Sequence, residues 1–276
     1  MKRLFNYTEA DSLIHNLSGV SKLLGFMAMT FTVMLTYDIR VIAAVLVISI
    51  FVFRASGIRL RDLRVVLIYI TVFMTINYIL TFVFDPQYGV RLYGTEHVIY
   101  SFTERYTLTQ EQLLYQTTKI SKYAATVPFG LLFFLTTHPS EFASSMNRVG
   151  IHFKVAFAFS LTLRYLPDIS SEYLIISKAQ QARGLELSKK QKFSRRVKEY
   201  VKMIVPLIMS SLDRIDNISD AMDLRGFAKK KKRTWYNTRK LSRNDKLAII
   251  FTLAVFASSL IITIFVNQGR FWNPFV

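Results

Sequence analysis

The sequence predicts an all-α, polytopic membrane protein with about five transmembrane helices and long amphipathic cytoplasmic helices. Apolar residues are concentrated before about residue 137 and again after residue 246, as in chains that cross a bilayer several times. The segment between them is polar, yet its apolar residues recur at helical spacing. We therefore expect an N-terminal transmembrane region of four spans at 1–137, a cytoplasmic helical region at 138–246, and a C-terminal transmembrane helix with an outer tail at 247–276.

The spans are predicted from five apolar segments, which cover residues 20–37, 39–53, 65–84, 113–137 and 247–266. The first two are shorter than the roughly 20 residues that a spanning helix needs. They fit either short helices in a thinned bilayer or a re-entrant pair. Lys119 and Lys122 lie within the fourth segment. Charges inside a span are often functional, but lysines near its outer end can also extend to the interface, and both interpretations stay open here.

The distribution of charge predicts the orientation of the chain. Loop 54–64 carries four arginines and one aspartate, whereas loop 85–112 carries two arginines and four acidic residues. Loops rich in Lys and Arg stay in the cytoplasm, so the N-terminus and segment 138–246 should be cytoplasmic, with loop 85–112 and the C-terminus outside. This topology explains the net charge of +18 better than nucleic-acid binding does. The absence of cysteine excludes disulfides and thiolate metal sites.

Segment 138–246 should contain three long helical stretches. Residues 153–166 are nearly all apolar and are expected to end at Pro167. A second helix is expected over 169–182, with Asp168 as its N-cap. The third stretch, 192–224, contains Pro206, where we expect a kink.

Two of these helices end in the same pair of residues. Arg183-Gly184 closes one and Arg225-Gly226 closes the other, and each arginine follows an alanine four residues earlier. Gly is common just past a helix and Arg is favourable at the negative end of the helix dipole, so each ending alone fits an ordinary cap. Their repetition favours a function, in which each Arg reaches a carboxylate in a groove of a partner protein.

The third stretch also carries a row of aspartates, Asp213, Asp216, Asp220 and Asp223. Carboxylates at this spacing can hold a divalent cation, so the alternative function is an integral membrane enzyme that uses the row with a metal. The Asp-Gly pair and the downstream aspartates of membrane phosphoalcohol transferases are missing, which favours a solvated or salt-bridged face. No Gly in the chain is followed by Lys, which excludes a Walker A loop, so any ATP hydrolysis must occur in another chain.

Further short motifs accompany the two Arg-Gly endings. They are Asp11, Ser12, His15 and 21–24 near the start; Thr136, Thr137, Pro139, Glu141 and Phe142 after the fourth span; Arg164 and Pro167; Gln180 and 182–184; and Pro206, Leu207, Ala221, Met222 and 225–227. With these residues, almost the whole chain resembles the transmembrane T subunit of energy-coupling factor (ECF) transporters, a group that includes the cobalt-transporter membrane subunit. The second motif departs from the family's Ala-Arg-Gly form at Leu224.

The resemblance implies a non-enzymatic scaffold in the cell membrane. Its partners would be two ATP-binding-cassette (ABC) ATPases, the same or different, and a small membrane substrate-binding S subunit, which selects a vitamin or a metal ion. ATP and Mg would bind to the ATPases, and this chain would hold no cofactor or metal. The residues implied to dock the ATPases are Ala182, Arg183 and Gly184 for one and Leu224, Arg225 and Gly226 for the other. Those implied to support the coupling helices are Arg164, Pro167, Gln180, Pro206 and Met222.

Overall fold

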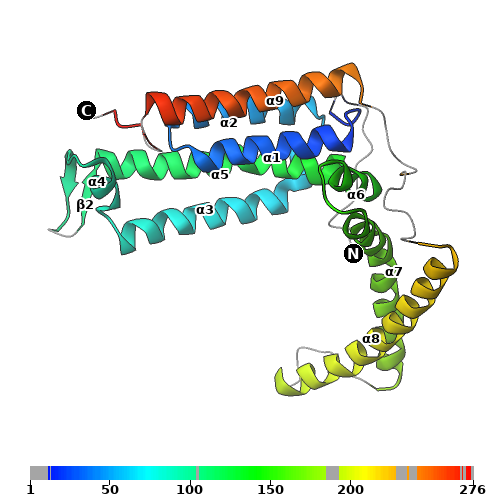
Figure 1. Ribbon diagram of the computed structural model, residues 1–276. Helices are drawn as coiled ribbons and strands as arrows, with labels where there is room; N and C mark the ends of the chain where they lie inside the picture. The colour runs from blue at the N-terminus through cyan, green and yellow to red at the C-terminus, as the bar shows by residue number, and fades with distance from the viewer. Residues whose placement is uncertain are drawn as a thin grey trace. The chain divides into compact units, whose positions relative to one another are not determined.

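The computed structural model describes residues 12, 14–103, 106–184, 193–227, 235, 241–267, 269 and 272–274, so Asp11 lies outside the described residues. The chain divides into two compact units, which are described separately (Figure 1). The first combines residues 1–138 with 239–276, and the second is 139–238. The C-terminal helix therefore belongs to the same unit as the N-terminal spans.

All five predicted spans are helices of the first unit. These are α1 (Gly19–Leu35), α2 (Ile39–Ala55), α3 (Arg64–Phe84), α5 (Gln110–Thr136) and α9 (Arg243–Ile261), which continues into a π-helical turn, η2 (Ile262–Val266). Among the described residues, α3 and the stretch Arg243–Val266 are each long and apolar enough to cross a membrane. Helix α5 gives a third candidate when it is counted together with the short helix that follows it at 140–148. Helices α1 and α2 have only 17 residues each, as their short apolar segments indicate.

Four of these helices form the core of the first unit. Helix α1 lies against α9 and α5, and α2 lies against α5 (Figure 1). Met29, Val33, Val45, Ala125 and Phe129 are buried where α1, α2 and α5 meet. By contrast, α3 leaves all of its residues at least partly exposed and has few contacts with α5. Its apolar surface is therefore available to lipid or to another protein.

Both lysines inside the fourth span contact neighbouring elements. The Lys119 Nζ donates a hydrogen bond to the Thr81 hydroxyl on α3 at 3.0 Å. The Lys122 Nζ lies 3.2 Å from the centre of the Tyr37 ring and donates to the Met34 carbonyl at 3.4 Å. These partners allow two charged groups to remain inside a largely apolar helix.

The segment 85–112 was expected to be a loop, but part of it is regular structure. It contains α4 (Tyr88–Tyr93) and an antiparallel hairpin of β1 (Val98–Ser101) and β2 (Thr107–Thr109), with Val98 opposite Thr109. The hairpin is fastened to the start of α5 by Glu111, whose carboxylate accepts hydrogen bonds from Thr95 and from the backbone amide of His97. A short 3₁₀ turn, η1 (Leu60–Leu63), leads into α3.

The second unit consists of α6 (Pro139–Arg148), α7 (Phe153–Ala182) and α8 (Phe193–Leu224) within the described residues. The predicted break at Pro167 is wrong, because α7 continues through it, and Asp168 lies inside the helix rather than at an N-cap. Proline removes one backbone hydrogen bond, but residues on both sides of Pro167, such as Tyr165 and Glu172, lie against α8. Packing along one neighbour keeps the helix continuous. Helix α8 also continues through Pro206, and the kink expected there stays a prediction.

Candidate docking surface on α7 and α8

Helices α7 and α8 cross in an antiparallel arrangement (Figure 1). Near the middle, the Glu172 carboxylate of α7 accepts hydrogen bonds from the Ser210 hydroxyl and, at 2.5 Å, from the Arg214 guanidinium of α8. At the start of α7, the Phe157 ring lies 4.6 Å, centroid to centroid, from the ring of Phe227, just past the end of α8. The beginning of α7 is therefore beside the end of α8.

The end of α7 has the predicted Arg-Gly geometry. Arg183 is the C-cap, and its backbone amide bonds to the carbonyls of Ala179 and Gln180. Gly184 has φ +87°, a left-handed conformation that glycine adopts without steric strain. Its amide donates to the Gln181 carbonyl at 3.0 Å, which closes the last turn. The helix therefore ends at Arg183, with Gly184 in the left-handed conformation just beyond it.

The end of α8 is a complete Schellman motif. Gly226 has φ +64°, and its amide donates to the Asp223 carbonyl at 2.9 Å. The amide of Phe227 donates to the Met222 carbonyl, also at 2.9 Å, which is the second hydrogen bond of the motif. The preceding Leu224 is 90% exposed, so a large apolar side chain projects beside Arg225 at this helix end.

The two arginines lie at opposite ends of the α7–α8 pair. Arg225 is near the first turns of α7, through the contact between Phe227 and Phe157, whereas Arg183 caps the last turn of α7. A 30-residue helix is about 45 Å long, so the two motifs are held far apart. Both arginines are exposed, and within the described ranges neither guanidinium makes an ion pair or hydrogen bond. Each is available to a carboxylate from another protein.

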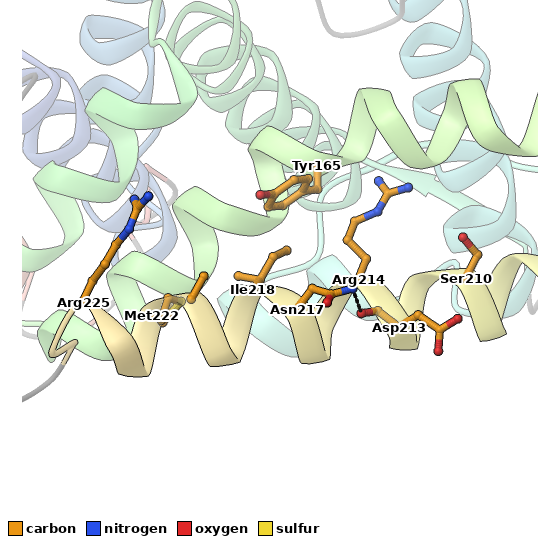
Figure 2. A pocket seen from close by; sticks show the side chains of 9 residues that line it. Tyr165, Ser210, Asp213, Arg214, Asn217, Ile218, Met222 and Arg225 are labelled. Atoms are coloured by element: carbon orange, nitrogen blue, oxygen red, sulfur yellow. Dashed lines mark hydrogen bonds between the residues drawn. The ribbon is translucent and has the colours of Figure 1, made fainter.

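A groove of about 560 Å³ runs between α7 and α8 toward Arg225 (Figure 2). Figure 2 shows Tyr165 of α7 facing the side chains of α8, with Arg225 at the last turn of α8 and Arg214 about three turns earlier. The groove is lined by Tyr165, Ser210, Asp213, Arg214, Asn217, Ile218, Ala221, Met222 and Arg225. Met222 also lines a second, mainly apolar groove of about 360 Å³ between the same helices. The supporting role expected of Met222 stays a prediction.

The remaining candidate residues do not gather at these grooves. Ala182 is exposed beside Arg183, and Arg164 and Pro167 are exposed on α7. Gln180 is half-buried one turn before the end of α7, and Pro206 is exposed on α8. The structure therefore brings Met222 together with Arg225, whereas these five are distributed along the two helices.

Apolar residues of α8 recur at the spacing of one helix face, and α7 covers this stripe only in part. Ile218 and Met222 line the grooves with α7, whereas Ile204, Ile208 and Ile215 are exposed. The residues Val201, Val205, Met209 and Leu212 extend the same exposed apolar surface. Solvent-exposed apolar patches of this kind mark sites of protein or membrane contact.

The aspartates Asp213, Asp216, Asp220 and Asp223 are all exposed on α8. Among the described residues, no group of three or more His, Cys, Asp or Glu side chains is arranged to hold a metal ion. Asp213 lines the first groove, and its backbone carbonyl accepts a hydrogen bond from the Asn217 side chain at 2.8 Å (Figure 2).

Three features of this surface were not predicted from the sequence. The Glu172–Arg214 ion pair joins residues 42 positions apart, and Tyr165 forms one wall of both grooves. Phe153 contacts Phe227 and Trp235, which anchors the chain beyond α8 to the start of α7. Glu172 offered a signal for the ion pair, because a carboxylate on a helix that packs against another helix needs a partner.

The chain is similar to known transport proteins over most of its length. The family CbiQ, described as cobalt transport protein, matches residues 10–236. The chain is 24% identical over 254 residues to the ECF transporter transmembrane protein EcfT of Lactococcus lactis, covering 88% of this chain and 91% of that protein. It is 25% identical over 271 residues to EcfT of Streptococcus equi, covering 91% and 92%.

A third relative has a different name. The chain is 27% identical over 260 residues to a putative ABC transporter ATP-binding protein, BL0043, of Bifidobacterium longum. The match covers 89% of this chain but only 31% of that relative's length. With the match to the family over most of the chain, these relatives identify the protein as a member of the CbiQ cobalt transport protein family and as the transmembrane component of an ECF transporter.

Proposed function

We propose that this chain couples two ABC ATPases to a substrate-binding S subunit of an ECF importer. Arg183, flanked by Ala182 and Gly184, docks into one ATPase, and Arg225, flanked by Leu224 and Gly226, docks into the other. The observation that supports this most is the pair of exposed arginines at opposite ends of α7 and α8. Two sites about one helix length apart suit two separate partner proteins of similar shape.

The proposal that the partners are ATPases has two further supports. The sequence contains no Walker A loop, so ATP and Mg belong to other chains. The Bifidobacterium longum relative, named as an ATP-binding protein, includes a segment similar to nearly all of this chain. Two proteins that work together permanently are often joined in one polypeptide, so this relative supports an association between an ATP-binding protein and a chain of this kind.

Motion of the ATPases would reach the S subunit through α7 and α8. Coupling requires an element that contacts both machines and whose position differs between two states. The exposed apolar residues of α8, including Ile204, Ile208 and Ile215, offer a surface along which α8 could slide against a partner. The S subunit would select the substrate, a vitamin or a metal ion, and release it inside the cell.

This function requires α6, α7 and α8 to lie in the cytoplasm, with the C-terminus outside. Because the chain has no natural cysteine, single-cysteine variants can test the orientation with a membrane-impermeant maleimide. A cysteine at Lys178 should react only after the membrane is opened, and one at Asn273 should react in intact cells. The reverse labelling would contradict the orientation.

The docking roles can be tested by charge reversal in the whole transporter. Arg183→Glu and Arg225→Glu should each weaken co-purification with the ATPases, and the double variant should abolish both co-purification and ATP-driven uptake. Lys178→Glu is a matched control, because Lys178 is an exposed cation on α7 about one turn before Arg183. Normal ATPase binding and uptake in the double variant would refute the proposed docking.

A further inference from the structure

A groove at the start of α3 is not used by the proposed coupling function. It has a volume of about 470 Å³ and is lined by Arg61, Arg64, Leu67, Ile68, Thr71 and Val72. Positions 64, 67, 68, 71 and 72 follow the spacing of one helix face. The groove is therefore basic at the end of the helix and mainly apolar over the following two turns.

The basic end of this groove is suited to an anion. Arg61 and Arg64 are exposed, and within the described part of the chain neither takes part in an ion pair. The N-terminal end of α3 has no side-chain cap at Leu63 and no acidic residue in its first turn. The positive end of a helix dipole favours an anion, and guanidinium groups bind phosphate oxygens in pairs.

The apolar part of the groove is suited to a hydrocarbon chain. Helix α3 is a candidate membrane span, and none of its residues is buried by the rest of the described unit. Ile68 and Val72 are each about half exposed within the groove. A phosphate at the helix end and a hydrocarbon tail along the helix together describe a phospholipid.

We propose that this groove binds one anionic phospholipid molecule. Its phosphate lies against Arg61 and Arg64 at the end of α3, and one acyl chain lies along Leu67, Ile68 and Val72. The nearby Arg59 adds a third positive charge and Asp62 one negative charge, so residues 59–64 carry a net charge of +2, which favours a headgroup with net negative charge over a zwitterionic one. Inorganic phosphate lacks the tail that would cover the apolar face, so the lipid is the expected occupant.

The test is lipid binding to the purified, delipidated full-length chain, measured by native mass spectrometry in mild detergent. Phosphatidylglycerol should bind more tightly than phosphatidylcholine of the same acyl composition. The variant Arg61→Gln/Arg64→Gln should weaken phosphatidylglycerol binding by about thirtyfold, since each Arg contributes to the attraction. The variant Arg61→Lys/Arg64→Lys keeps both charges but loses the paired donors, so its affinity should be intermediate.

The matched control is Arg243→Gln, which removes an exposed arginine at the start of α9, outside the groove. This variant should bind phosphatidylglycerol as the unmodified chain does. An equal loss of affinity in Arg243→Gln would overturn the proposal in favour of a general effect of charge. Equal binding of the two lipids, or displacement of phosphatidylglycerol by inorganic phosphate, would also overturn it.

Discussion

The Asp245 carboxylate on α9 accepts a 2.7 Å hydrogen bond from the backbone amide of Ser18, the N-cap of α1. It also accepts from the Ser21 hydroxyl at 2.9 Å and from the amide of Ser242, which completes the capping box of its own helix. One carboxylate therefore binds the N-terminal ends of two helices that are far apart in the sequence. Asp245 is only 2% exposed.

Replacing Asp245 should destabilise the membrane unit. In Asp245→Ala, the buried donors of Ser18 and Ser21 lose their acceptor, and we expect the free energy of unfolding to fall by about 3 kcal/mol. Thermal unfolding in detergent, followed by tryptophan fluorescence, measures the change. The control is Asn244→Ala, because Asn244 is the exposed neighbour of Asp245. Equal melting temperatures for the two variants would contradict the prediction.

The ion pair between Glu172 and Arg214 should couple α7 to α8. Both side chains are partly exposed, at 19% and 33%, so solvent screening reduces the interaction to about 1 kcal/mol. A double-mutant cycle with Glu172→Gln and Arg214→Gln, measured by thermal unfolding, isolates the pair. Strictly additive effects of the two substitutions would show that the pair contributes nothing.

The left-handed conformation of Gly184 predicts a local effect of substitution. A Cβ at this position would meet nothing within 4 Å, so the penalty in Gly184→Ala comes from the backbone alone, and we expect about 1 kcal/mol. Faster amide hydrogen exchange in the last turn of α7 would report it. Gly184→Asn should have a smaller effect, because Asn tolerates this conformation better.

Gly150 offers a matched control for this experiment. It follows α6 with φ +111°, and a Cβ there would also meet nothing within 4 Å. Gly150→Ala should therefore accelerate exchange at the end of α6 and leave the end of α7 unchanged. Faster exchange at α7 in this variant would indicate a general loss of stability rather than a local one.

Asp38 predicts a dependence of stability on pH. Burial by itself would raise the pKa of Asp38, but hydrogen bonds from Arg40 and Asn267 outweigh it and place the pKa below its ordinary value of 3.8. Because the folded-state pKa is the lower one, the stabilisation is fully present above the unfolded pKa. It is lost as the pH falls below 3.8 and through the folded pKa.

This dependence can be measured through thermal unfolding of the purified chain as a function of pH. Asp38→Asn keeps the size of the side chain but cannot ionise, so the difference in melting temperature from the unmodified chain should shrink as the pH falls below 4. A difference that stays constant from pH 7 to pH 3 would contradict the assigned pKa shift.

The sequence predicts the helices of this protein better than their contacts. The five apolar segments and both Arg-Gly endings were found because hydropathy and glycine placement are local signals. The hairpin near Val98 was missed because its strands are short and all four residues of β1 are exposed, so burial leaves no alternating pattern.

The candidate site shows the same division. The positions of Arg183 and Arg225 at helix ends follow from the residues beside them, whereas the Glu172–Arg214 pair depends on how two helices cross. The break expected at Pro167 shows that tertiary packing can override a strong local signal. Packing of Tyr165 and Glu172 against the same partner helix is information that local sequence does not contain.

The continuity of α7 through Pro167 also has a mechanical consequence. Without a break, the helix passes a displacement at one end to the other end as a single rod about 45 Å long. A push on Arg183 would therefore be felt at the start of α7, where Phe153 and Phe157 contact Phe227 just beyond α8. The two Arg-Gly endings are thus linked mechanically through the length of one uninterrupted helix.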